Sequence, residues 1–490
     1  MNYFLKRSGG KVIKWIHRGS TVFRNGKKQE EGPWQPLPEH IIKEFNNTRQ
    51  LGPQKCICYA PFKMMYFAFG GEVIACCHNR KHVLGRYPEK SLTEIWKGRE
   101  LSVLRDYIAH DDLSHGCEVC KTLMLSRNYD GAKNALYDRY RIKPWPITME
   151  FELENTCNLA CVICNELFSS NIPGKGHEKS PYDEGFVAQL EPFIPHLREA
   201  KFYGGEPFLI PVYYRIWELM LKLNPGIQIL VQTNGTVLND KVKQLLTSGR
   251  FSINVSIDSL NKERFEHIRK NAHFEKTIEN TRWFADYCHK KGTHFGIIPT
   301  PNRLNWMDLP EITRWAGELG ARVYFNTLIT PLDLALWNLP PEELHEKFRM
   351  LSASLIPAQN TVEKANKIHF RDFLTQLISW EDANRKMPAD TGKKAVTLAT
   401  VQQVKHDFLA ALSLNLAQKK EGDILMQLFH QSLVSLSANH PVDIIFLALK
   451  NIAISTIVDE LETRDPEHIR KIAGKKLFEA GGQFIIIENQ

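Results

Sequence analysis

The chain has 490 residues, a formal charge of +8, 43% hydrophobic residues and 24% charged residues. A chain of this length exceeds what one hydrophobic core supports, so two to four structural units are expected. No apolar run reaches the ~18–20 residues that span a bilayer, and the N-terminus lacks the apolar core of a secretory signal. The sequence therefore predicts a soluble cytoplasmic protein with no membrane partner.

Residues 1–55 are predicted to form an irregular basic leader with Gly and Pro punctuation. Its first thirty residues concentrate the positive charge, in Lys6, Arg7, Lys11, Lys14, Arg18, Arg24, Lys27 and Lys28. Two interpretations stay open, an arm that contacts an acidic peptide, phosphate or nucleic acid, and a solvated extension. The second is preferred, so nucleic acid is not expected as a partner.

Residues 56–145 are rich in cysteine. Nine of the ten cysteines fall between positions 56 and 164, and in a cytosolic chain such clustering indicates metal or cluster ligation rather than disulfides. Short apolar runs on either side of Gly70-Gly71 predict a β-hairpin. Apolar residues at helical spacing predict helical structure from Leu92 to Ile108.

Residues 146–335 alternate between strand-like and helix-like segments. The expected strands are Ile147–Leu153, Ala200–Tyr203, Ile227–Gln232, Ser252–Ile257, His294–Pro299 and Arg322–Asn326. The expected helices are Val212–Leu223, Asp240–Ser248, Lys262–Arg269, Phe274–Lys291 and Leu309–Leu319. Repeated strand–helix units indicate an α/β fold with a parallel sheet. Six strands are too few for an eight-stranded barrel, so a partial (β/α)6 TIM-like barrel is predicted.

Residues 336–490 are predicted to be mainly helical. The expected helices there are Val401–Gln418, Asp423–Ser437 and Pro441–Leu461, and Phe484–Ile487 is expected to be a short final strand. Such a region could be a substrate lid, a partner surface or plain helical packing, and packing is preferred.

Cys157, Cys161 and Cys164 are spaced CxxxCxxC in a loop after the first expected strand. Three thiolates on one loop can bind three corners of a cubane cluster and leave the fourth iron open, whereas most all-cysteine clusters have four protein ligands. An open metal position is typical of catalytic sites. The spacing alone leaves a zinc site or a chance group open.

This loop resembles the cluster loop of the radical S-adenosylmethionine (SAM) superfamily, and the segment about forty residues after Cys164 strengthens the resemblance. Gly204, Gly205, Glu206 and Pro207 are similar to the GGE motif of that family. Glycines permit close backbone approach, a carboxylate accepts hydrogen bonds from an ammonium group such as that of SAM, and proline suits a first helical turn. A plain strand-to-helix turn is the structural alternative.

The resemblance extends to further SAM-binding positions. Asn234 lies in a segment similar to the TNG motif of the family. Ser256 and Asp258 lie where the family offers polar groups to the ribose and methionine portions of SAM, and Arg269 matches an arginine that pairs with the SAM carboxylate. Ile163 replaces the aromatic residue that often packs on adenine. For these residues a turn, strand-end capping or a surface charge is the structural alternative.

The upstream cysteines resemble an auxiliary-cluster domain of the SPASM type or its shorter relative, the twitch domain. That domain usually follows the barrel, and here it precedes it. The resemblance implies one auxiliary cluster, with Cys58, Cys76, Cys117 and Cys120 as the ligands. Four cysteines in two halves also suit zinc, which stays open.

The remaining cysteines have weaker assignments. Cys77 could replace Cys76, because adjacent residues of a strand point to opposite faces. Cys56 is a spare ligand or a plain thiol, and Cys288 is expected to be a packing residue.

The resemblance implies a reaction and two 4Fe-4S clusters. A low-potential donor such as flavodoxin or ferredoxin supplies an electron, SAM is cleaved reductively to a 5′-deoxyadenosyl radical, and the radical abstracts hydrogen from the substrate. The preferred substrate is a peptide or protein side chain, and the alternative is oxidation of a small molecule such as a sugar or aminocyclitol. A non-enzymatic metal- or RNA-binding protein is a more remote alternative.

Overall fold

The computed structural model describes residues 34–165, 168–172, 180–386, 394–437, 445–446, 449, 454–462 and 484–487. The eight basic residues of the first thirty positions lie outside the described residues. By its internal contacts the chain divides into two compact units, which are described separately. Unit 1 comprises Met1–Ala160, Asn165–Val255 and Asn271–Phe295, and unit 2 comprises Cys161–Cys164, Ser256–Lys270 and Gly296–Gln490.

Unit 1 is built on a seven-stranded run of sheet in the order β3-β2-β1-β4-β5-β6-β7. Its strands are β1 (Met64–Phe67), β2 (Glu72–Ile74), β3 (Gly85–Arg86), β4 (Thr148–Phe151), β5 (Glu199–Phe202), β6 (Gln228–Thr233) and β7 (Phe251–Val255). β4, β5, β6 and β7 pair in parallel, as the repeated strand–helix pattern predicts. The hairpin around Gly70-Gly71 is also present, because β1 and β2 pair antiparallel across these glycines.

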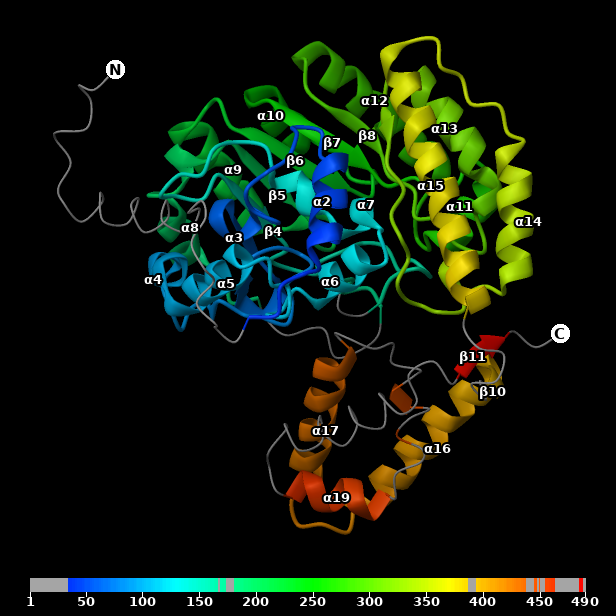
Figure 1. Cartoon of the computed structure of the whole chain (residues 1–490). Helices are drawn as coiled ribbons and strands as arrows, with labels where there is room; N and C mark the ends of the chain where they lie inside the picture. The colour runs from blue at the N-terminus through cyan, green and yellow to red at the C-terminus, as the bar shows by residue number, and fades with distance from the viewer. Residues whose placement is uncertain are drawn as a thin grey trace. The chain divides into compact units, whose positions relative to one another are not determined.

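Helices surround the sheet of unit 1, as Figure 1 shows for α8, α9 and α10 beside β4, β5 and β6. The helices of unit 1 are α2 (Glu39–Thr48), α3 (Ala60–Lys63), α4 (Leu92–Lys97), α5 (Arg99–Ala109), α6 (Glu118–Leu125), α7 (Tyr129–Ala132), α8 (Glu184–Leu190), α9 (Pro211–Leu223), α10 (Asp240–Ser248) and α12 (Phe274–Lys291). The helical stretch expected from Leu92 to Ile108 is two helices, because the chain at Gly98 is extended.

The two faces of the sheet differ because side chains alternate along each strand. Phe67, Phe151 and Phe202 are register partners on β1, β4 and β5, and their rings stack in a row. Phe186 of α8 and Trp217 of α9 pack edge-on against this row. This aromatic core fixes which face of the sheet is covered by helices and which face carries the polar residues described below.

One pairing in unit 1 does not follow from the sequence pattern. β1, in the cysteine-rich segment, pairs in parallel with β4, the first of the six expected barrel strands, with Tyr66 opposite Glu150. The cysteine-rich segment therefore continues the sheet, and the division expected at residue 146 falls inside one compact unit.

The leader is not irregular throughout, which corrects the expectation for residues 39–48. α2 forms there because Ile41 and Phe45, four residues apart, lie on one helix face and are both buried. The preceding residues 34–38 include Leu37, whose backbone N–H donates to the Asp111 carbonyl at 2.9 Å.

Unit 2 contains the end of β8 (Phe295–Ile297) and β9 (Arg322–Val323), which pair in parallel. Its helices are α11 (Lys262–Ile268), α13 (Leu309–Glu318), α14 (Pro341–Ser352), α15 (Thr361–Lys386), α16 (Leu398–Leu416), α17 (Gly422–Ser437) and α19 (Ile454–Glu462). All six expected strands are present, and together with the helices they confirm the α/β fold with a helical C-terminal region.

The C-terminal helices form a small core of their own within unit 2. Leu412 of α16, Phe429 of α17 and Val458 of α19 belong to one buried cluster. The expected final strand is β11 (Phe484–Ile487), which pairs in parallel with β10 (Lys394–Thr397), a strand that the sequence pattern did not indicate. Of the expected helix Pro441–Leu461, residues 441–444, 447–448 and 450–453 lie outside the described residues, and its last part is α19. None of the described helices is both long and apolar enough to cross a membrane.

Candidate cofactor sites

The GGEP segment follows β5 and lies against the backbone that leads into Cys157. The N–H of Gly205 donates to the Glu154 carbonyl at 3.1 Å, and the N–H of Glu206 donates to the Thr156 carbonyl at 2.8 Å. A Cβ atom on Gly205 would lie 2.2 Å from the Thr156 carbonyl oxygen. Only glycine permits this approach, so the segment fixes the start of the cysteine loop.

Glu206 is completely buried, and its carboxylate accepts hydrogen bonds from the end of the neighbouring strand β6. Its Oε2 accepts a hydrogen bond from the backbone N–H of Asn234 at 2.7 Å, and its Oε1 accepts one from Thr233 Oγ1 at 2.7 Å and one from the N–H of Phe208 at 3.2 Å. A carboxylate with donors on both oxygens holds the end of β6 against the end of β5. The sequence pattern placed Glu206 at the SAM ammonium but did not indicate this contact.

Asn234 connects this network to the first cluster cysteine. Its Nδ2 lies 3.8 Å from Cys157 Sγ, as a long hydrogen bond, and donates to Asn158 Oδ1 at 3.0 Å. The N–H of Leu159 also points to Cys157 Sγ at 3.4 Å. Burial raises the pKa of the Cys157 thiol, and these donors lower it in part. Donors around a sulfur favour its thiolate form, which is the form that binds iron.

The other two cysteines of the triplet belong to unit 2 together with Ile163. All three residues are partly exposed. The N–H of Val162 donates to the Ile268 carbonyl at the end of α11, at 2.9 Å. The N–H of Cys164 donates to the Cys161 carbonyl at 3.1 Å, which closes a tight turn between the two cysteines.

Two predicted SAM contacts of unit 2 are paired with each other. Arg269 Nη2 lies 2.7 Å from Asp258 Oδ2, and both side chains are buried. Asp258 Oδ1 also accepts a hydrogen bond from the N–H of Thr300 at 2.7 Å. Ser256, two residues before Asp258, is partly exposed.

A second candidate site lies in unit 1, at a small cavity of about 20 Å³. The cavity brings together Cys58 before α3, Cys76 after β2, and Cys117 and Cys120 at the start of α6. All four thiols are buried. Burial raises the pKa of the Cys58 and Cys76 thiols to about 12. Buried thiolates need a cationic partner, which iron or zinc would supply.

Polar groups surround this four-cysteine cavity. Asn79, itself buried, donates from Nδ2 to Cys117 Sγ at 3.0 Å, and the N–H of Ala60 points to Cys58 Sγ at 3.5 Å. Hydrogen bonds to cluster sulfurs tune the reduction potential of iron–sulfur clusters. Asn79 is a functional candidate that sequence reasoning missed, because nothing in its local pattern reveals a contact 38 residues away.

The remaining cysteines lie elsewhere. Cys56 does not line the cavity, and its Sγ donates to the Cys58 carbonyl at 3.0 Å. Cys77 also does not line it and is partly exposed. Cys288 is completely buried in α12.

The face of the sheet opposite the aromatic core carries a row of polar residues. Tyr66, Glu150 and Lys201 are register partners on β1, β4 and β5, and Lys201 Nζ lies 2.9 Å from Glu150 Oε1. Arg80 Nη2 lies 2.8 Å from Glu152 Oε2 and 3.2 Å from the Tyr66 hydroxyl. We call these five residues the inner-face row. The sequence analysis missed it, although the alternation of Glu150, Phe151 and Glu152 was a signal.

Comparison with known proteins assigns part of the chain to a family. Residues 152–316 match the model of the radical SAM superfamily, so the chain carries a radical SAM domain. Residues 56–121 match the SPASM model, an iron–sulfur cluster-binding domain, so the expected N-terminal auxiliary-cluster domain is confirmed.

This radical SAM protein is an enzyme, and the non-enzymatic alternative is wrong. Its cofactors are SAM, the 4Fe-4S cluster of the radical SAM domain and an additional iron–sulfur cluster of the SPASM domain. The cysteines described above fit these groups by the chemistry of their donors, because thiolates are the usual ligands of iron–sulfur clusters.

Among curated proteins, the radical SAM enzyme is similar to a probable GTP 3′,8-cyclase from Methanocaldococcus jannaschii, with 26% identity over 46% of this chain and 70% of that protein. It is 27% identical to an AdoMet-dependent heme synthase from Methanosarcina barkeri, over 38% of this chain and 51% of that protein. It is 30% identical to a probable GTP 3′,8-cyclase from Methanocella arvoryzae, over 27% of this chain and 41% of that protein. The chain thus spans about half or less of the length of the last two relatives.

Solved structures show a more distant likeness. A structure of anSMEcpe with bound AdoMet matches with a TM-score of 0.33 and 20% identity, over 42% of this chain and 58% of that one. Streptococcus suis SuiB bound to S-adenosylmethionine matches with a TM-score of 0.31 and 13% identity, over 55% of this chain and 52% of that one.

Proposed function

We propose that this enzyme cleaves SAM reductively and uses the 5′-deoxyadenosyl radical to abstract hydrogen from a peptide or protein side chain. The observation that carries the SAM-cleavage part is the network from Glu206 through Asn234 to Cys157. It joins the GGE-like segment, the TNG-like segment and the first cluster cysteine by hydrogen bonds. Cysteines that lie close in sequence by chance are not expected to be joined to both segments by hydrogen bonds.

The proposed ligands of the radical SAM cluster are Cys157, Cys161 and Cys164. The cluster, when bound, supplies an electron and an open iron for SAM. The proposed SAM contacts are Ile163, Gly204, Gly205, Glu206, Pro207, Asn234, Ser256, Asp258 and Arg269. Glu206 acts by holding the Thr233–Asn234 backbone, and Asp258 acts by orienting the guanidinium of Arg269.

The proposed ligands of the auxiliary cluster are Cys58, Cys76, Cys117 and Cys120. Their shared cavity supports this set over one that includes Cys56 or Cys77. Four thiolates suit either a tetrahedral zinc ion or an iron–sulfur cluster, and the match of residues 56–121 to an iron–sulfur cluster-binding domain favours the cluster. Four protein ligands favour electron transfer over direct ligation of substrate.

The inner-face row supports a polar substrate. The Lys201–Glu150 pair and the Arg80–Glu152 pair can exchange their contacts for those of a substrate amide, hydroxyl or amine. A peptide side chain and its backbone offer such groups. A small polyol or aminocyclitol offers them too, so dehydrogenation of a small polar molecule is the second candidate. A flavodoxin or ferredoxin is the proposed electron donor.

The decisive experiment mixes the reduced, iron-reconstituted protein with SAM and measures 5′-deoxyadenosine by chromatography. The parent should form it, and a variant with Cys157, Cys161 and Cys164 changed to alanine should not. Equal formation by both proteins would overturn the proposed cluster site. Deuterium transfer into 5′-deoxyadenosine from labelled peptide pools or labelled polyols then distinguishes the two substrate classes.

A further inference from the structure

Arg49 forms a buried ion pair at the edge of the auxiliary domain. Its Nε donates to Asp138 Oδ2 at 2.8 Å and its Nη2 pairs with Asp138 Oδ1, so the contact is bidentate. The side chains are only 1% and 3% exposed. Arg49 follows α2, in the segment expected to be an irregular leader, and Asp138 follows the short helix Asn134–Tyr137. Both lie outside residues 56–121, the range that matches the SPASM model.

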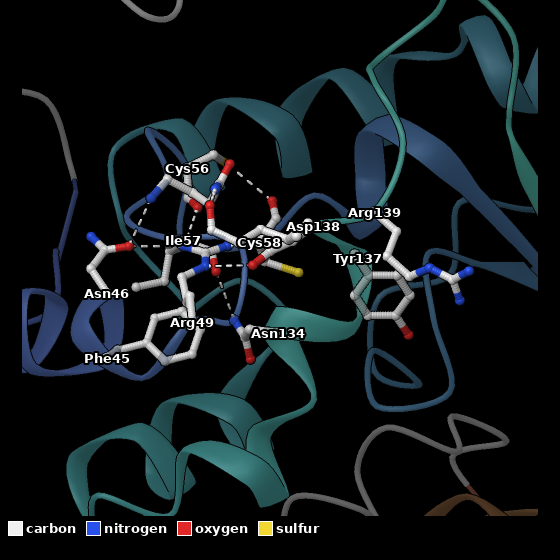
Figure 2. Close-up of polar contacts among 12 residues, drawn as sticks. Phe45, Asn46, Arg49, Cys56, Ile57, Cys58, Asn134, Tyr137, Asp138 and Arg139 are labelled. Carbon is white, nitrogen blue, oxygen red and sulfur yellow. Dashed lines mark hydrogen bonds and ion pairs between the residues drawn. The ribbon is translucent and has the colours of Figure 1, made fainter. Parts of the chain in front are cut away.

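The same guanidinium holds the segment that carries Cys58. Arg49 Nη1 donates to the Cys56 carbonyl at 2.8 Å and to Asn46 Oδ1 at 3.2 Å. Figure 2 shows Arg49 between Asp138 and the Cys56–Cys58 segment, with the Phe45 ring against it. From the other side, Asn134 Nδ2 donates to the Ile57 carbonyl at 3.3 Å. The two carbonyls before Cys58 are therefore held by fixed donors.

A second buried cation, Lys63, completes the arrangement. Lys63 Nζ donates to the carbonyls of Tyr137, Asp138 and Arg139 at 2.8, 3.4 and 3.2 Å. Lys63 ends α3, which begins two residues after Cys58. The Cys58 ligand is thus tied to residues 134–139 on both of its sides, by Arg49 before it and Lys63 after it.

Burying two charges has a desolvation cost that a surface position would avoid. A buried ion pair at this position, despite the cost, is consistent with a role in holding the neighbouring backbone in place. Arg49 Nη1 contacts the Cys56 carbonyl, two residues before Cys58, so the ion pair lies directly beside the segment that carries this proposed ligand.

We propose that Arg49 is a positioning residue of the auxiliary cluster. The Arg49–Asp138 pair fixes the Cys56–Cys58 segment so that Cys58 points into the cavity, and its charges set the reduction potential of the cluster bound there. The cluster-binding part of the chain accordingly extends from Arg49 to Asp138. This inference rests on the proposed ligand set Cys58, Cys76, Cys117 and Cys120.

The test uses the full chain with Cys157, Cys161 and Cys164 changed to alanine, so that bound iron reports the auxiliary cluster alone. In this background we compare Arg49→Lys and the double variant Arg49→Met/Asp138→Asn, which removes both charges of the ion pair together. Glu44→Gln is the matched control, because Glu44 lies on α2 and pairs with Arg127 at an exposed position. The first readout is the rate at which a chelator removes iron.

The double variant should lose iron at least tenfold faster than the parent background, Arg49→Lys at an intermediate rate, and Glu44→Gln at the parent rate. Iron loss from the double variant at the parent rate would overturn the positioning role. Circular dichroism confirms that each variant is folded before iron is counted.

The second readout is the midpoint potential, followed by the electron paramagnetic resonance of the reduced cluster. Asp138→Asn leaves the Arg49 charge uncompensated, and a cation stabilises the more negative reduced cluster. The potential should therefore move to a more positive value, and a shift in the opposite direction or no shift would contradict the electrostatic role. Iron retained after Cys58→Ala would instead contradict the ligand set, so the two failures are distinguishable.

Discussion

Glu206 Oε2 accepts the backbone N–H of Asn234 at 2.7 Å, which ties the ends of β5 and β6 together beside Cys157. Because the carboxylate is completely buried, its donors cannot be replaced by water. Asn234 in turn points its Nδ2 toward Cys157 Sγ. A side chain at the GGE-like position therefore acts on the cluster loop through the neighbouring strand end.

Glu206→Gln should weaken both folding and SAM binding. The glutamine amide nitrogen cannot accept the hydrogen bonds that one carboxylate oxygen accepts, and a lost hydrogen bond to a buried charged group costs about 1.5–3 kcal/mol. We expect thermal unfolding at a lower temperature and SAM affinity reduced about tenfold or more, as measured by calorimetry. Glu154→Gln is the control, since Glu154 is only partly buried and its carboxylate has one described hydrogen bond, which it accepts from Thr156 Oγ1. Unchanged SAM affinity in Glu206→Gln would refute the role of the network.

Gly205→Ala should disable the radical SAM cluster while the auxiliary cluster remains. The new Cβ would lie 2.2 Å from the Thr156 oxygen and 2.5 Å from the Asn155 oxygen, so the backbone before Cys157 has to move. We expect iron content to fall and 5′-deoxyadenosine formation to drop more than tenfold. Gly226→Ala is the matched control, because only Asn224 Oδ1 lies within 4 Å of its Cβ position, at 3.9 Å. Wild-type activity in Gly205→Ala would show that the close approach is not needed.

Single cysteine variants should sort into two groups by iron and sulfide content. In the background without the radical SAM triplet, alanine at Cys58, Cys76, Cys117 or Cys120 should abolish bound iron, because each sulfur faces the cavity. Alanine at Cys56, Cys77 or Cys288 should leave iron in place. Stoichiometric zinc with no sulfide in the parent protein would refute the iron–sulfur assignment of this cavity.

Asp111→Asn should stabilise the protein at neutral pH. Burial raises the pKa of Asp111 from 3.8 to about 6, so the folded state binds this proton more tightly than the unfolded state. A raised carboxyl pKa favours folding below pH 4, and this advantage is lost as the pH rises through 6. Asparagine keeps the neutral form and tolerates the positive φ of 54° at this position.

The stability difference between Asp111→Asn and the parent should grow from near zero at pH 4 to about 1–3 kcal/mol above pH 6. Denaturant unfolding of the apo-protein across this range measures it. A difference that does not depend on pH would mean that the carboxyl does not titrate in this window.

The sequence predicted the strands and helices of the barrel better than it predicted which strands pair with each other. The expected strand Ser252–Ile257, observed as β7, and the other expected strands are apolar or alternating runs bounded by turn residues, so local pattern suffices to find them. The pairing of β1 with β4 joins residues about eighty positions apart, and no local period records it. α2 was missed because its two buried positions, Ile41 and Phe45, lie among polar residues in a basic segment.

The candidate sites divide in the same way. Cysteine spacing and the GGEP and TNG-like segments are local signals, and they were readable from the sequence. The inward direction of Glu206, the pairing of Arg269 with Asp258 and the contact of Arg49 with Asp138 depend on tertiary packing. Polar residues that act by positioning others have no spacing rule, so only the structure reveals them.

The parallel pairing of β1 with β4 also bears on how the enzyme could be dissected. Removing residues 34–145 would leave β4 as a bare sheet edge with unpaired backbone groups, and it would strip Phe67 from its stack on Phe151. Such an edge is a template for association between chains. A radical SAM fragment that starts at residue 146 should therefore aggregate rather than fold as a smaller enzyme. The cysteine-rich segment thus also covers the edge of the sheet at β4. Any shortened variant needs another segment that covers this edge.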